Sequence, residues 1–132
     1  MIFWLIILGV ATFLIIVHFV FGVALKLYDK TNSFDLILHA LFAAMFAMIG
    51  YWIAPHKYHA IAFGFCFAVT IAGLWEIIEF AIDGIFGTNM QRWDDSTTSR
   101  RGSGLIDSMW DIIASVIGAS IVSVILLLIA CC

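Results

Sequence analysis

Residues 75–83 read Trp-Glu-Ile-Ile-Glu-Phe-Ala-Ile-Asp, which sets three acidic residues into a strongly apolar run. An α-helix turns by about 100° per residue, so positions 76, 79 and 83 fall within an arc of about 60°. Glu76, Glu79 and Asp83 therefore share one face of the predicted helix. Because a carboxylate is costly in apolar surroundings, this face indicates an internal site instead of a solvated surface.

The rest of the chain has the composition of a membrane protein. It has 132 residues, of which 64% are hydrophobic and 11% are charged, and it contains one proline. This composition excludes an ordinary soluble domain and a disordered segment. The formal net charge is −3 and the six Lys and Arg residues are scattered, which argues against a nucleic-acid partner. We expect contacts with membrane lipids, and a homo-oligomer or another membrane protein as the partner.

Four apolar runs predict four membrane-spanning helices. The runs cover residues 2–25, 34–54, 59–86 and 105–130. Each is near or above the length of about 20 residues that crosses the hydrocarbon core. Short connectors join them, apart from a longer polar loop over residues 88–104. The predicted fold class is all-α, a polytopic integral membrane protein in which residues 1–132 form a single four-transmembrane-helix bundle.

Local signals agree with these boundaries. Pro55 requires the second helix to end near Ala54, and Gly87 provides a residue that readily takes the left-handed conformation at a helix end. The first run lacks the basic start and the small-residue cleavage site of a signal peptide. We therefore expect it to be a retained helix.

The distribution of Lys and Arg predicts an orientation. The second connector holds only Lys57, whereas the first and third connectors, which must lie on the same side, hold Lys26, Lys30, Arg92, Arg100 and Arg101. Basic residues are enriched in cytoplasmic connectors. Both termini are therefore predicted outside the cytoplasm.

This topology brings ionisable residues of all four helices to similar depths. With a rise of about 1.5 Å per residue, four of them lie about 8–10 Å inside the cytoplasmic ends of the spans: His18, His39, Glu79 and Asp111. The other acids lie nearer the surface (Asp35, Asp83 and Asp107) or deeper (Glu76). Ionisable residues within spans usually face the bundle interior and mark ion, proton or catalytic sites.

Small residues share faces with these acids. Ala114 and Gly118 lie on the face of the fourth helix that carries Asp107 and Asp111. Small side chains let membrane helices approach closely, so this face is predicted to point inward.

The charges on these residues narrow the chemistry. Six carboxylates converge with no Lys or Arg inside any span: Asp35, Glu76, Glu79, Asp83, Asp107 and Asp111. Full ionisation without counterions would be prohibitive. Bound cations, shared protons and a structural polar network are the three explanations. We favour one or two divalent metal ions (Mn, Fe, Zn or Mg), because carboxylate and imidazole groups are suitable ligands for them.

Individual roles follow from type and spacing. The predicted metal ligands are His39, Glu76, Glu79, Asp107 and Asp111, with His18 and Asp35 as further candidates. His39 follows Asp35 by four residues, so the two share a helix face. Asp83 is the predicted general base. The Glu-x-x-Glu spacing differs from the Glu-x-x-His motif of di-iron bundles, so the likeness to that class is partial.

The polar loop carries arginines that allow two interpretations. Arg92, Arg100 and Arg101 could bind the oxygens of a substrate phosphate in bidentate fashion, or they could serve only to set the topology. The cysteines are less informative. Cys66 lies in an apolar run, and the pair Cys131 and Cys132 could be a lipidation site, a ligand pair or an ordinary tail.

Two motifs carry a resemblance to a known family. The first is Trp75-Glu76-Ile77-x-Glu79-Phe80-x-x-Asp83, with Gly87 and Gln91 after it, and the second is Gly104-Leu105-x-Asp107-Ser108-x-x-Asp111. They resemble the small YjdF-like bacterial inner-membrane proteins over the second half of the chain. The resemblance implies a polytopic helical protein of a bacterial inner membrane with these acids at signature positions, and it implies no activity.

Three functions are compatible with this site. The leading hypothesis is a metal-dependent hydrolase or transferase acting on a phosphorylated or lipid-like substrate near the cytoplasmic face. The first alternative is a proton- or ion-coupled transporter or channel that works as an oligomer. The second is a non-catalytic subunit of a larger membrane complex.

Overall fold

A computed structural model describes residues 2–25, 27, 32–56, 59–87, 90–91 and 100–131. The elements in chain order are α1 (Ile2–Val17), η1 (His18–Ala24), α3 (Asn32–Ile53), α4 (Ala60–Phe86) and α5 (Arg100–Cys131). The described part of the chain contains helices and no strand.

Within the described residues, four helices are long and apolar enough to cross a membrane, which confirms the predicted fold class. These candidate spans are Ile2–Gly22, Ser33–Ile53, Ala60–Phe86 and Gly104–Cys131. Large apolar side chains cover their outer surfaces, including those of Phe13, Phe80 and Leu128, each more than half exposed. A helix satisfies its own backbone hydrogen bonds, so it can present such a surface to lipid.

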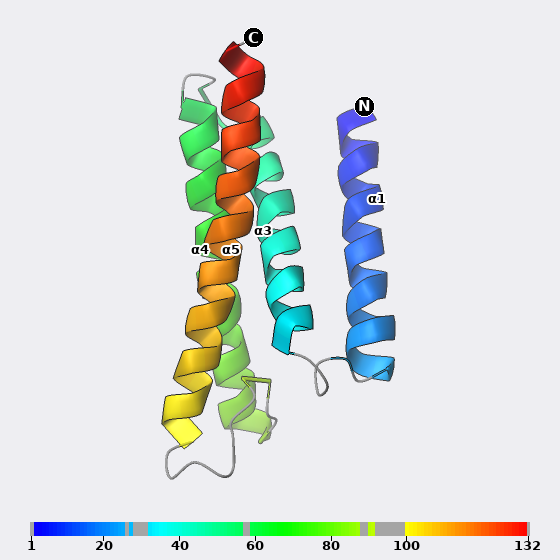
Figure 1. Cartoon of the computed structure of the whole chain (residues 1–132), viewed down its shortest axis with the longest axis vertical. Coiled ribbons are helices and arrows are strands. Elements are labelled where there is room, and N and C mark those ends of the chain that lie inside the picture. The colour runs from blue at the N-terminus through cyan, green and yellow to red at the C-terminus, as the bar shows by residue number, and fades with distance from the viewer. Residues whose placement is uncertain are drawn as a thin grey trace.

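The helices run alternately up and down. Figure 1 shows α3, α4 and α5 side by side, with α1 standing apart beside α3, and α1 begins at the end of the bundle where α5 ends. Among the described elements, α1 and η1 contact only each other and α3. Ile7 and Leu14 of α1 form a buried cluster with Leu38 of α3. The ring of Phe3 stacks on Trp52, with ring centres 4.1 Å apart.

Glycines bring α3, α4 and α5 into backbone contact. A Cβ atom added to Gly118 of α5 would collide with the carbonyl group of Ala40 in α3. A Cβ on Gly64 of α4 would lie 2.5 Å from the carbonyl oxygen of Ala47, and one on Gly50 would lie 2.8 Å from the Cα of Gly64. These three helices therefore leave no room for an added side chain at these crossings, as expected for small residues at membrane helix interfaces.

The ends of the helices match the sequence signals in part. α3 ends at Ile53, two residues before Pro55. Gly87 ends α4 with φ 64°, and its N–H donates to the carbonyl oxygen of Asp83 at 3.0 Å. However, α5 begins at Arg100 and not at Leu105, so the helix includes residues that were predicted to lie in the 88–104 loop. The Gly and Ser residues here favour a loop by propensity, but packing overrides propensity, and Gly104 is buried.

The first predicted helix changes character at His18. Residues His18–Ala24 form a π-helix, in which the N–H of Leu25 donates to the carbonyl oxygen of Val20 at 3.0 Å. No sequence pattern distinguishes this segment from a continuous α-helix. π-Helical turns are frequent at functional sites, and this one carries one of the candidate site residues.

Candidate metal centre

Asp35, His39 and Asp111 form a compact triad between α3 and α5. The Nε2 atom of His39 lies 3.7 Å from Oδ1 of Asp35 and 3.9 Å from Oδ2 of Asp111. These separations exceed those of hydrogen bonds, which are about 2.7–3.2 Å. One ligand atom from each residue lies within 4.8 Å of the other two, so the triad can hold a metal ion.

The size of the triad suits a divalent cation. Two ligands that each lie about 2.1 Å from one ion are at most about 4.2 Å apart, and the limit is about 5 Å for the longer bonds to calcium. The His39 distances fall inside the smaller limit. Small side-chain rotations would therefore bring all three ligand atoms into coordination.

Helix geometry explains how α3 supplies two of the three residues. Asp35 lies in the first turn of α3, where the positive end of the helix dipole favours a carboxylate. His39 follows one turn later on the same face. Asp111 reaches the pair from α5 and is 2% exposed, so the triad joins two helices at a buried position.

Glu76 adds a third helix to the site. Its Oε1 atom lies 3.8 Å from Nδ1 of His39, on the other side of the imidazole ring from the triad. Glu76 is 6% exposed. Neither of its carboxylate oxygens has a hydrogen bond to the described part of the chain. The carboxylate is therefore close to the triad, although it does not belong to it.

Three other predicted ligands lie around this centre. Glu79 accepts a hydrogen bond from Nε1 of Trp75 at 2.6 Å, and its carboxylate is within electrostatic range of Glu76 and Asp35. His18 is likewise within electrostatic range of Asp35. The triad does not include Glu79, His18 or Asp107, so the role of these three residues as metal ligands stays a prediction.

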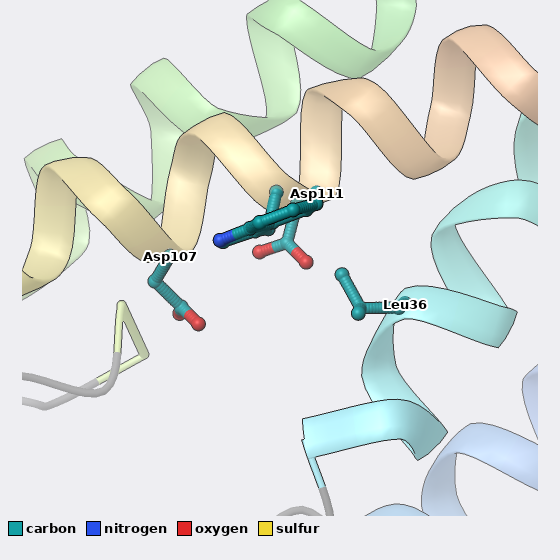
Figure 2. A pocket seen from close by; sticks show the side chains of 4 residues that line it. Leu36, Asp107 and Asp111 are labelled. Carbon is teal, nitrogen blue, oxygen red and sulfur yellow. The ribbon is translucent and has the colours of Figure 1, made fainter.

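A cavity adjoins the triad. Its volume is about 250 Å³, and the described residues that line it are Leu36, Asp107, Trp110 and Asp111. Figure 2 shows the carboxylates of Asp107 and Asp111 directed from α5 into this space, with Leu36 of α3 across from them. Asp111 thus belongs to both the triad and the cavity wall. Sequence reasoning did not identify Leu36 or Trp110, because apolar residues beside an acid look like ordinary packing residues.

Asp83 has a structural role at the end of α4. Its carboxylate accepts hydrogen bonds from the backbone N–H groups of Met90 at 2.8 Å and Gln91 at 3.0 Å. Nε2 of Gln91 in turn donates to Oγ of Ser108 at 2.8 Å. The side chains of Asp83, Gln91 and Ser108 are buried. This network fixes the start of the α4–α5 connector against α5, and the role of Asp83 as a general base stays a prediction.

Removing the Asp83 carboxylate should destabilise the protein. We expect Asp83→Ala to lower the free energy of unfolding by about 1.5–3 kcal/mol, because two N–H donors lose a charged acceptor. Asp83→Asn, which keeps one carbonyl oxygen, should lose less. Thermal unfolding in detergent measures both effects. The control is Gly84→Ala, at a neighbouring position where an added Cβ meets no atom within 4 Å. An Asp83→Ala variant as stable as this control would contradict the structural role.

The arginine predictions lie outside the described side chains. Arg92 falls in the segment 92–99, which is not described, and Arg100 and Arg101 are described only as the first helical residues of α5. Their proposed contact with a substrate phosphate therefore stays a prediction.

Comparison with known proteins places the chain in a family. The model of the predicted membrane protein family DUF2238 matches residues 2–131. The chain belongs to this family. The DUF2238 match includes both halves of the chain, so α1 and α3 belong to the family as well, whereas the resemblance to YjdF-like proteins stays a prediction. The first half of the chain contributes Asp35 and His39 to the triad. Its hydropathy alone does not distinguish it from other apolar helices. No curated protein and no solved structure matches the chain.

Proposed function

We propose that this membrane protein binds one divalent cation at Asp35, His39 and Asp111 and uses it as a hydrolase or transferase on a phosphorylated, lipid-like substrate. One observation carries the proposal: Asp111 belongs to the triad and also lines the adjoining cavity. A cation held by the triad would therefore be next to a space that a substrate can enter.

The charges of the triad support a divalent ion. Two aspartates contribute two negative charges, and a neutral His39 contributes none, so one divalent cation balances the charge of the triad. This balance matters because uncompensated charge is expensive in a bilayer. Mg²⁺ and Ca²⁺ favour oxygen ligands, whereas the imidazole also suits Mn²⁺, Fe²⁺ and Zn²⁺. We expect one of these last three ions.

The cavity lining supports an amphipathic substrate. Leu36 and Trp110 are apolar, whereas Asp107 and Asp111 are acidic. The two acids would repel a phosphate group unless a cation were bound next to the cavity, and a cation held by the triad would meet the cavity at Asp111. The volume of about 250 Å³ is below the about 300–1,000 Å³ of pockets that enclose a whole small molecule. A head group would fit while its apolar tail remained in the lipid.

The reaction assigns a role to Asp107. A bound cation would polarise the phosphoryl oxygen and activate the attacking group. Asp107, on the cavity wall, accepts the proton of water in a hydrolase or of an alcohol in a transferase as the new P–O bond forms. The bond from phosphorus to the leaving oxygen breaks, and that oxygen takes up the proton. We place the reaction in the cytoplasmic leaflet, following the distribution of Lys and Arg, and in a bacterial inner membrane, following the resemblance to YjdF-like proteins.

Ion transport is the second candidate. Ion transport is favoured by the carboxylates that lie outside the triad, those of Glu76, Glu79 and Asp107. A single bound ion does not require these three groups as ligands. The contact of Gly118 with Ala40 argues against transport, since the backbones of α5 and α3 leave no passage between these helices at that point.

Metal content tests the proposal. Protein purified in detergent should contain about one Mn, Fe or Zn per chain by elemental analysis, and chelation followed by titration should restore one site. The double variant His56→Ala, His59→Ala is the matched control, because these exposed histidines lie in the opposite connector. No stoichiometric metal in the wild-type protein would contradict the proposal. Phosphate release from a phosphatidic acid in detergent micelles then tests the reaction, and metal-dependent ion flux in proteoliposomes without phosphate release would favour transport.

A further inference from the structure

His39 lies between two sets of carboxylates. Its Nε2 atom faces Asp35 and Asp111 at 3.7 and 3.9 Å, and its Nδ1 atom faces Glu76 at 3.8 Å. A neutral imidazole has a proton on one nitrogen and a lone pair on the other. A cation in the triad requires the lone pair on Nε2, so the proton must then be on Nδ1. That proton points to Glu76.

The Glu76 carboxylate is buried although neither of its oxygens makes a hydrogen bond of standard geometry. It is 6% exposed, and neither carboxylate oxygen forms a hydrogen bond with the described residues. A buried carboxylate without hydrogen bonds is costly, particularly within a membrane. An N–H donor on the adjacent imidazole would lower this cost.

We infer that Glu76 is a positioning residue that accepts the Nδ1 proton of His39 and so keeps Nε2 directed at the cation. Histidine ligands of metals commonly donate their other N–H to a carboxylate in this way, which fixes the tautomer and the ring orientation. The Nδ1 atom of His39 and Oε1 of Glu76 are 3.8 Å apart, so a shift of about 1 Å would form this hydrogen bond. The inference rests on the proposed function, and it replaces the prediction that Glu76 is itself a ligand.

The surroundings of Glu76 support this role. The Ser108 side chain lies next to the Glu76 carboxylate, and its Oγ accepts the hydrogen bond of Gln91. A hydroxyl that accepts from one side has its own hydrogen available for another acceptor. Ser108 can thus hold one carboxylate oxygen while the other faces His39. A line of side chains then joins the α4–α5 connector to the cation.

Two substitutions separate positioning from ligation. Glu76→Gln retains a carbonyl oxygen that can accept the Nδ1 proton, whereas Glu76→Leu has no acceptor. We expect Glu76→Leu to weaken Mn²⁺ or Zn²⁺ binding by about 10–100-fold with one site per chain retained, and Glu76→Gln to stay within a few-fold of wild type. The visible spectrum of the Co²⁺-loaded protein should keep its coordination signature in Glu76→Gln. If Glu76 is a ligand, Glu76→Gln should lose as much affinity as Glu76→Leu, and the spectrum should change.

The outcomes of this experiment are distinct. Wild-type protein without a metal site would overturn the proposed function, and the inference with it. A wild-type site that Glu76→Leu leaves unaltered would overturn the inference alone. If Glu76→Leu does not fold, Glu76→Asp replaces it, since the shorter side chain withdraws the acceptor by one methylene group. The inference then expects weaker binding in Glu76→Asp than in Glu76→Gln, and the reverse order would overturn it.

Discussion

Replacing Asp111 with asparagine is expected to abolish the binding of divalent cations at the triad. Asp111 provides one of the three ligand atoms and one of the two negative charges of the triad. Loss of a residue that only orients a ligand costs about 10–100-fold in metal affinity, so the loss of a ligand should exceed about 100-fold. Titration of metal-free protein with Mn²⁺ or Zn²⁺ measures this change.

Thermal stability gives an independent measure of the same substitution. A cation at 100 times its Kd should stabilise the wild-type protein by about 2.7 kcal/mol, and it should leave Asp111→Asn unchanged. Without metal, Asp111→Asn should be at least as stable as wild type, because ligand atoms of Asp35 and Asp111 lie within 4.8 Å of each other and the substitution removes the repulsion between the two carboxylates. A metal-free variant that is much less stable would indicate that Asp111 is a packing residue.

Asp107→Asn is the matched control on the same helix. Asp107 lines the cavity one turn before Asp111 and is not a member of the triad. The metal affinity of Asp107→Asn should stay within a few-fold of wild type. Its turnover should fall by about 10²–10⁴-fold, the usual contribution of a general base. Equal loss of metal in both variants would place the ion in the cavity, between the two acids of α5.

The second large effect is expected from Gly118→Leu. The first atom of the new side chain would collide with the carbonyl group of Ala40, and backbone cannot move aside as a flexible side chain can. Overpacking usually costs about 1–3 kcal/mol, and we expect a value at or above this range. Because Ala40 directly follows His39, separating α5 from α3 should also remove the metal site.

Smaller substitutions make this prediction specific. Gly118→Ala should destabilise the protein in the same direction, since its Cβ alone meets the Ala40 backbone. Gly73→Ala is the control: an added Cβ there has no atom within 4 Å, and alanine favours a helix over glycine by about 0.5–1 kcal/mol. Thermal unfolding and metal titration should both separate the two variants. Equal behaviour would mean that α3 and α5 do not approach closely at Gly118.

The sequence predicts the helices well because each signal is local. Four apolar runs define the spans, and Pro55 and Gly87 mark two of the ends. The start of α5 was placed too late because Gly and Ser residues resemble a loop, whereas burial of Gly104 is a property of the packed bundle. The π-helix at His18 depends on hydrogen bonding that no residue pattern encodes.

The residues of the site could be predicted from the sequence more fully than the directions of their side chains. The spacing of Asp35 and His39 indicates a shared face, and depth along the helices brings Asp111 to the same region. However, the depth of a residue along its helix does not determine the direction in which its side chain points. Glu76 and Glu79 lie one turn apart, yet Glu76 faces His39 while Glu79 accepts a hydrogen bond from Trp75. Rotation of α4 about its axis selects between them, and that rotation depends on packing against α3 and α5.

Because α5 is longer than the hydrocarbon core, the depth of the triad in the membrane depends on the thickness of the bilayer as well as on the protein. The apolar span of α5, Gly104–Cys131, has 28 residues and at a rise of about 1.5 Å each is about 42 Å long, whereas the hydrocarbon core is about 30 Å thick. Such hydrophobic mismatch is met by tilting or by extending into the interface. If the Cys131 end is level with one interface, about 20 residues fill the core and Asp111 lies at the opposite boundary, level with the ester linkages of the lipids. A thicker bilayer would submerge the triad, and a thinner one would raise it into the headgroup layer.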